Sequence, residues 1–248
     1  SWAAASEERI RGEKEKDSLP ETVLWFNATY APLTQSNKSF GTNWKLVGGM
    51  EVSDYNADFC RQTLERDWEI TDAASALETV ESLKEKGHRE KLRQCMEELE
   101  KREILDVDEQ TFADTVHGLI EAGEIEDNAF RYVIVYFLHQ DGLDADCIAA
   151  WDLCRVNQLY ADFYICGYMT YEEAMDASLE NSLILQGMYS SWEEMVNSYM
   201  LGYQFWKGDP VLTEDSPTKK RYQCYLELLE LEDGPYTLDW NMDLGKSW

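Results

Sequence analysis

The sequence predicts an all-α fold, a single compact domain of about nine or ten helices with no significant sheet. Apolar residues recur at i, i+3 and i+4 along most of the chain, which is the period of a helix and not of a strand. Two capping boxes, Thr170-x-x-Glu173 and Ser191-x-x-Glu194, mark helix starts. Five prolines and 14 glycines in 248 residues are too few for a turn-rich β-sandwich.

The helices follow one another along the chain with few interruptions. In order, we predict them at 1–17, 18–31, 53–68, 72–86, about 92–99, 108–122, 127–140, 144–166, 170–189, 191–206 and 217–231. Residues 1–17 form a surface helix or tail, and residues 18–248 form the domain.

Residues that favour helix ends support these boundaries. Ser18 and Glu21 offer a capping box, and Ser53 and Asp72 are good N-caps for the next two helices. Gly87 is suited to end a helix in the left-handed conformation.

Two segments have particular expected roles. The stretch from Pro32 to residue 49 lacks helical periodicity and is predicted to form the longest loop. The helix at 127–140 is apolar on more than one side, through Phe130 and Phe137 among others, so we expect it at the centre of the fold.

The chain is strongly acidic. Its 49 Asp and Glu residues against 22 Lys and Arg give a formal net charge of −27, which repels nucleic-acid phosphates at long range. We therefore predict no nucleic-acid partner, whereas a protein partner with a basic surface fits. No stretch approaches the roughly 20 apolar residues of a membrane span. We therefore expect a soluble domain. Because the chain begins Ser1-Trp2 and not with Met, the expected compartment stays open: the domain is either cytoplasmic or exported, with the signal or anchor missing from this chain.

Motifs for metal, cofactor and nucleophile chemistry are not evident. The six cysteines form no CxxC pair and are read as reduced, small hydrophobic residues. The three histidines include no HExxH arrangement, and the chain has no GxSxG or glycine-rich phosphate loop. We assign no catalytic residue, no metal site and no cofactor. Ser191 is read as an N-cap.

Trp151-Asp152-x-x-Arg155 is the sharpest local signal. Asp152 and Arg155 are three residues apart and share one helical face, where they can pair and stay partly hydrated. The pair either ties this helix to a neighbour, at the His88-Arg89 corner or the Ser191 cap, or presents Arg155 to an anion. We favour the first reading. His88 is read as a hydrogen-bond donor to carbonyl groups at a helix end.

Two ordered sets of motifs resemble a known family. The first set comprises Ala150-Trp151-Asp152-x-x-Arg155, Gly167-Tyr168-x-Thr170-x-Glu172-Glu173-Ala174, Ser191-Trp192-Glu193-Glu194 and Tyr199-x-x-Gly202-x-x-Phe205-Trp206. The second comprises Leu64-x-x-x-Trp68-x-Ile70, Ala76-Leu77 and Leu83-x-x-x-Gly87-His88-Arg89. Together they resemble the bacterial domain-of-unknown-function family 1266 over residues 55–207.

The resemblance implies an all-helical bacterial protein and brings no catalytic residues. It places seven residues in motif positions, which we take as the candidate binding residues: His88, Arg89, Trp151, Asp152, Arg155, Ser191 and Trp192. One position departs from the pattern, because similar sequences place glycine where this chain has Glu69. If that glycine ends a helix, the turn after Trp68 is expected to differ here.

Two functions remain open at this stage. The first is a non-enzymatic interaction or binding module that holds a basic partner through its acidic exterior or an aromatic groove. The second is an enzyme or small-anion-binding protein centred on His88, Arg89, Asp152 and Arg155. Convergence of those four side chains in an open pocket would favour the second, whereas burial of Asp152 and Arg155 against each other without a cavity would count against it.

Overall fold

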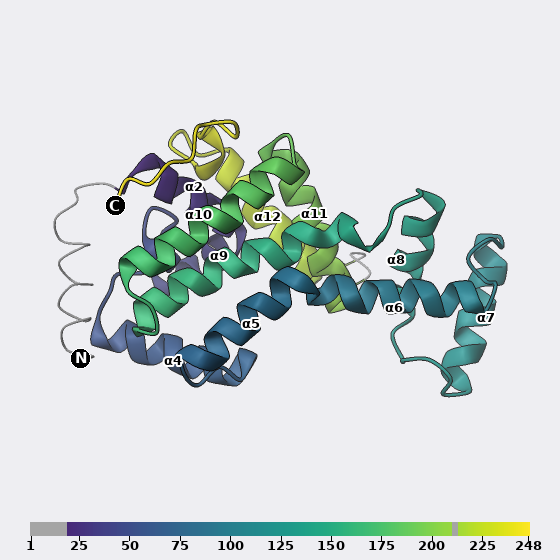
Figure 1. Cartoon of the computed structure of the whole chain (residues 1–248). Helices are drawn as coiled ribbons and strands as arrows, with labels where there is room; N and C mark the ends of the chain where they lie inside the picture. The colour runs from purple at the N-terminus through teal and green to yellow at the C-terminus, as the bar shows by residue number, and fades with distance from the viewer. Residues whose placement is uncertain (1–18, 210–212) are drawn as a thin grey trace.

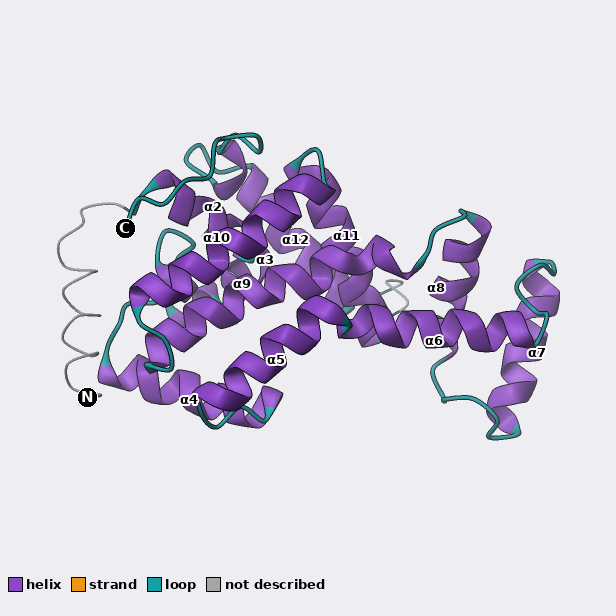
Figure 2. Ribbon diagram, viewed as in Figure 1, coloured by secondary structure: helices purple, strands orange, loops and turns teal. Residues whose placement is uncertain are grey.

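The computed structural model describes residues 19–209 and 213–248, and the chain is helical throughout that part, without a strand (Figures 1 and 2). The α-helices are α2 (Glu21–Thr29), α3 (Ala31–Ser36), α4 (Asp54–Trp68), α5 (Ala73–Glu85), α6 (Gly87–Lys101), α7 (Glu109–Glu121), α8 (Ala129–Gln140), α9 (Ala149–Cys166), α10 (Tyr171–Met188), α11 (Trp192–Lys207) and α12 (Pro217–Leu229). Short 3-10 helices are η1 (Lys38–Phe40), η2 (Val47–Gly49), η3 (Ala145–Ile148) and η4 (Pro235–Thr237). The all-α prediction is confirmed.

Helix α9 forms the centre of the fold and packs against α4, α5, α10 and α11 (Figure 1). Nearly all of its side chains are buried, including the polar Asp152, Arg155 and Asn157. A helix buried on every side must satisfy such polar groups internally. The polar residues of α9 are therefore where its packing is most specific.

The buried apolar residues form two large clusters. The larger surrounds α9 and takes residues from α2, α4, α5, α10 and α11. The second joins α6, α7, α8 and η3, with Phe205 of α11 completing it. Helices α6 to α8 project from the body as an arm (Figure 1), so the second cluster is the core of this arm.

Helix α8 is not central, contrary to the prediction. It buries one face, including Tyr132 and Val135, in the core of the arm, whereas Phe130 and Phe137 remain 42% and 48% exposed. An arm offers too little neighbouring surface to cover a helix on every side, so some apolar side chains of α8 stay exposed to solvent.

The predicted N-caps at Ser53, Asp72, Thr170 and Ser191 each accept a hydrogen bond from a first-turn backbone N–H. The predicted loop at 32–49 is wrong in its first part, because Pro32 lies in the first turn of α3, where a missing N–H costs nothing. The predicted helix at 1–17 and the Ser18 cap lie outside the described residues.

The turn after Trp68 is built with Glu69 in the left-handed conformation, at φ 58°. The backbone N–H of Ile70 donates to the carbonyl of Leu64 at 3.1 Å, as in a glycine-terminated helix. The expected difference at this turn is therefore absent, and Glu69 adopts a conformation that L-residues resist.

No helix in the described ranges combines the length and hydrophobicity that crossing a bilayer requires.

Candidate functional site

The chain turns at Gly87 between α5 and α6, and Asp152 of α9 closes this turn. The carboxylate of Asp152 is fully buried and accepts hydrogen bonds from the backbone N–H groups of His88 at 2.9 Å and Arg89 at 3.3 Å. It thereby caps α6, whose own N-cap residue makes no side-chain bond. Gly87 has φ +56°, and a Cβ atom there would lie 2.2 Å from the carboxylate carbon of Asp152. Only glycine fits both conditions.

Two arginines donate the remaining hydrogen bonds to the carboxylate of Asp152. The Nε of Arg89 donates to one carboxylate oxygen at 3.1 Å, and its Nη2 donates to the carbonyls of Leu83 and Lys84 at the end of α5. The Nη2 of Arg155 donates to the other oxygen at 2.8 Å. Arg89 therefore joins two helix ends to α9, and it takes the role of carbonyl donor that we predicted for His88.

Burial alone would raise the pKa of Asp152. The charges of Arg155 and Arg89 and the hydrogen bond from the backbone N–H of His88 outweigh this effect and hold the pKa below its usual value. The carboxylate is thus ionised at neutral pH. The pair is not partly hydrated as predicted, because Asp152 and Arg155 are only 0% and 8% exposed. Aromatic rings exclude water around Arg155, whose guanidinium carbon lies 4.1 Å from the Trp151 ring centroid.

His88 connects this buried cluster to the surface. Its Nδ1 lies 2.8 Å from the Nη2 of Arg155, and a guanidinium can only donate hydrogen bonds. Nδ1 is therefore the accepting nitrogen, and the ring proton sits on Nε2. That Nε2–H group has no hydrogen-bond partner among the described residues, and the side chain is 30% exposed.

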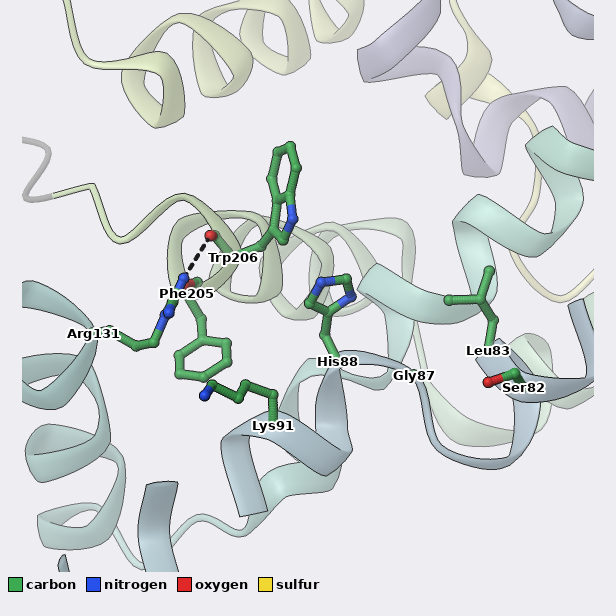
Figure 3. Close-up of a pocket in the computed structure, with 8 residues that line it drawn as sticks. All are labelled: Ser82, Leu83, Gly87, His88, Lys91, Arg131, Phe205 and Trp206. Atoms are coloured by element: carbon green, nitrogen blue, oxygen red, sulfur yellow. Dashed lines mark hydrogen bonds between the residues drawn. The ribbon is translucent and has the colours of Figure 1, made fainter. Parts of the chain in front are cut away.

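An open cleft of about 480 Å³ lies directly beside His88. It is lined by Ser82, Leu83, Gly87, His88, Lys91, Arg131, Phe205 and Trp206 (Figure 3). Lys91 and Arg131 lie towards one end of the opening and Ser82 and Leu83 towards the other. No acidic side chain lines the cleft, although the chain as a whole carries a net charge of −27.

The two cations of the cleft are held in place by one carboxylate. Glu126 accepts from Lys91 at 2.6 Å and from Arg131 at 2.8 Å. The hydrogen bond to Glu126 raises the pKa of Lys91, which keeps the amine protonated. Arg131 also donates to the carbonyls of Phe205 and Trp206 at the end of α11. One negative charge against two positive charges leaves this group net positive.

The seven candidate residues do not all meet at this place. Five of them, His88, Arg89, Trp151, Asp152 and Arg155, form the corner just described. Ser191 and Trp192 lie at the other end of α11 from Trp206, about 20 Å along the helix. Ser191 caps α11, and Trp192 packs against Trp25 and Trp240 in the main core.

Sequence reasoning missed Lys91 and Arg131. Lys91 follows His88 by three residues and so shares its helical face. Arg131 is the single Lys or Arg between Arg102 and Arg155. A lone cation within a long acidic stretch was the signal that could have identified it. Trp206 belonged to the motif but was not among the candidate binding residues, and it is 39% exposed at the cleft.

No group of three or more His, Cys, Asp or Glu side chains arranged to hold a metal ion occurs in the part of the chain that the structure describes. All six cysteines lie within that part and none is in a disulfide.

No curated protein and no solved structure matches the chain. One family does match, over residues 63–240, which include the Gly87 corner, the cleft and most of both cores. This match confirms the resemblance inferred from the two sets of motifs. The chain belongs to the family described as "Protein of unknown function (DUF1266)".

Proposed function

We propose that the protein binds a small anionic ligand, one that carries a phosphate or carboxylate group, in the cleft between α5, α6, α8 and α11. One observation carries the proposal: the cleft is lined by His88, Lys91 and Arg131 without a carboxylate, in a chain of net charge −27. When an acidic protein gathers cationic side chains in one concave site, the local electrostatic potential there is positive and attracts anions.

The three polar groups suit this ligand class. Arg131 and Lys91 supply charge-assisted hydrogen bonds. His88 supplies a neutral Nε2–H donor whose tautomer is fixed by Arg155. The buried Asp152 cluster acts indirectly, because it fixes the start of α6 and hence the positions of His88 and Lys91. In this role Asp152 and Arg155 are positioning residues.

The test is a titration with inorganic phosphate, pyrophosphate and acetate, followed by tryptophan fluorescence and by the melting temperature. Trp206 lines the cleft and Trp151 lies beside it, so binding should change the emission. A ligand that binds only the folded state raises the melting temperature. We expect at least one of these anions to do both.

A matched pair of variants separates a site from general charge effects. Lys91→Gln should weaken binding about tenfold, on the order of 1.4 kcal/mol. Lys101→Gln, on the same helix but about 15 Å further along it and with a 77% exposed side chain, should leave binding unchanged. The proposal fails if no anion binds at about 10 mM, where millimolar affinity would saturate the site, or if both variants behave alike.

A second candidate function rests on the arm. We infer that the apolar side chains exposed on it, Phe130 and Phe137 of α8 and Leu143 after it, can hold a basic amphipathic helix of a protein partner. Acidic side chains of α6 and α7, such as Glu97 and Glu109, are exposed on the same arm. A Leu/Lys amphipathic peptide should bind the protein and lose affinity in Phe137→Ser. Equal affinity of the peptide for the parent protein and for Phe137→Ser would exclude this surface as its binding site.

A further inference from the structure

A second cavity, of about 90 Å³, lies at the opposite end of α9 from Asp152. It is enclosed by α3, the segment around η2, α4 and α9, and the carboxylate of Asp162 is part of its lining. This cavity shares no residue with the anion cleft. Its chemistry is therefore independent of the function proposed above.

Asp162 is a carboxylate without a charge partner. It accepts one hydrogen bond, from the Nε2 of Gln158 at 3.1 Å, and no cationic side chain pairs with it among residues 19–209 and 213–248. Asp162 is half-buried, and carboxylates that are shielded from water are normally paired or coordinated, because desolvation of an isolated charge is costly. In agreement with this, burial raises the pKa of Asp162 to about 7. The group is therefore one whose ionised form a bound cation would stabilise.

The walls of the cavity are fixed by a hydrogen-bonded network. Asn27 donates to the carbonyls of Trp44 and Leu46 at 3.0 and 3.1 Å. The hydroxyl of Tyr30 donates to Asn27 at 2.6 Å and accepts from the backbone N–H of Gly48 at 3.1 Å. This network holds the η2 segment over α9, so the cavity is a built feature of the fold and needs no rearrangement to exist.

Further polar residues share the lining with Asp162. Thr34, Asn37 and Thr63 line the cavity, and their side chains make no hydrogen bond within the described residues. Phe59, which is 49% exposed, and Met50 add apolar surface. A primary ammonium group has three donors and no acceptor, which matches one carboxylate oxygen and two neutral oxygens.

We propose that this cavity binds the protonated amino group of a small primary amine, with Asp162 as its counter-ion. The hydroxyl groups of Thr34 and Thr63 accept its other two hydrogen bonds, and the attached carbon chain packs on Phe59 and Met50. The cavity of about 90 Å³ has room for an ammonium head with a short carbon chain. A quaternary amine has no N–H group and cannot donate these hydrogen bonds.

The experiment titrates the full chain with ethylammonium chloride by isothermal titration calorimetry, with tetramethylammonium chloride in parallel. We expect saturable one-to-one binding of ethylammonium and none of tetramethylammonium, which cannot donate a hydrogen bond. Asp162→Asn keeps the shape of the side chain and should weaken ethylammonium binding at least tenfold. Thr63→Val should weaken it several-fold.

Asp58→Asn is the matched control. Asp58 lies on α4 near the cavity, has a 68% exposed side chain and already pairs with Arg61, so its removal should leave ethylammonium binding unchanged. Circular dichroism and the melting temperature confirm that each variant is folded. The proposal is overturned if ethylammonium does not bind, in which case the cavity holds water only. It is also overturned if tetramethylammonium binds equally well, or if Asp162→Asn binds as the parent does.

Discussion

The substitution Gly87→Ala tests the corner between α5 and α6 most directly. Two costs are expected. The first is the left-handed conformation at φ +56°, which costs alanine about 1 kcal/mol relative to glycine. The second is steric, because the new Cβ would lie 2.2 Å from the Asp152 carboxylate and would displace it by roughly 1 Å.

Such a shift carries the carboxylate out of hydrogen-bond range of His88 and Arg89. Breaking the interactions of a buried charge costs about 3–5 kcal/mol. We therefore expect Gly87→Ala to lower the free energy of unfolding by about 4–6 kcal/mol in all, and the melting temperature by about 10–20 °C.

Gly123→Ala provides the control, because Gly123 also has a positive φ, +68°, but a Cβ there would meet nothing within 4 Å. It should cost only about 1 kcal/mol. Urea unfolding followed by tryptophan fluorescence measures both variants. In an Asp152→Ala background, the loss of unfolding free energy caused by Gly87→Ala should also be only about 1 kcal/mol, because the carboxylate that it displaces is gone. A double-mutant cycle measures this difference. Equal losses in Gly87→Ala and Gly123→Ala would refute the steric argument.

Three further outcomes are expected. Glu69→Gly should raise the free energy of unfolding by about 0.5–1 kcal/mol in urea titrations, because it relieves a left-handed L-residue at φ 58°; a decrease would contradict this reading. Asp152 has a lowered folded-state pKa, so its stabilisation is present above about pH 4, the unfolded value, and is lost as the pH falls through the folded value. The free energy of unfolding should therefore drop more steeply in acid for the parent than for Asp152→Asn, and parallel curves would exclude this contribution. Ser191→Ala should destabilise by about 1 kcal/mol through loss of the α11 cap, with anion affinity unchanged, whereas weaker binding would place Ser191 at the site.

The helical fold could be predicted from sequence because periodicity and caps are local signals. The N-caps at Ser53 and Ser191 follow from the residue type and its place before an apolar run. The position of α8 could not be predicted in the same way. Its apolar residues indicate that it packs, but not that it packs in a separate arm that leaves Phe130 and Phe137 exposed.

The buried half of the site was also partly visible in the sequence. Asp152 and Arg155 share a helical face, and the favoured reading placed them against either the His88-Arg89 corner or the Ser191 cap; they lie at the corner. The open half of the site, which is the cleft beside His88, could not be predicted from the sequence. Arg131 reaches the cleft because α8 packs beside the end of α11, a tertiary contact that no local pattern encodes. Trp192 occupies a motif position of the family and was a candidate binding residue, but it packs in the main core, away from the corner.

The Gly87 corner is also the joint between the two cores. Ser82 and Leu83 belong to the body, His88, Lys91 and Arg131 belong to the arm, and Trp206 comes from the helix that reaches into both. A ligand in the cleft would therefore contact both the body and the arm. Because Arg131 of α8 lines the cleft, binding of an anion there and binding of a partner to the exposed side chains of α8 would be thermodynamically linked if either ligand changes the position of α8.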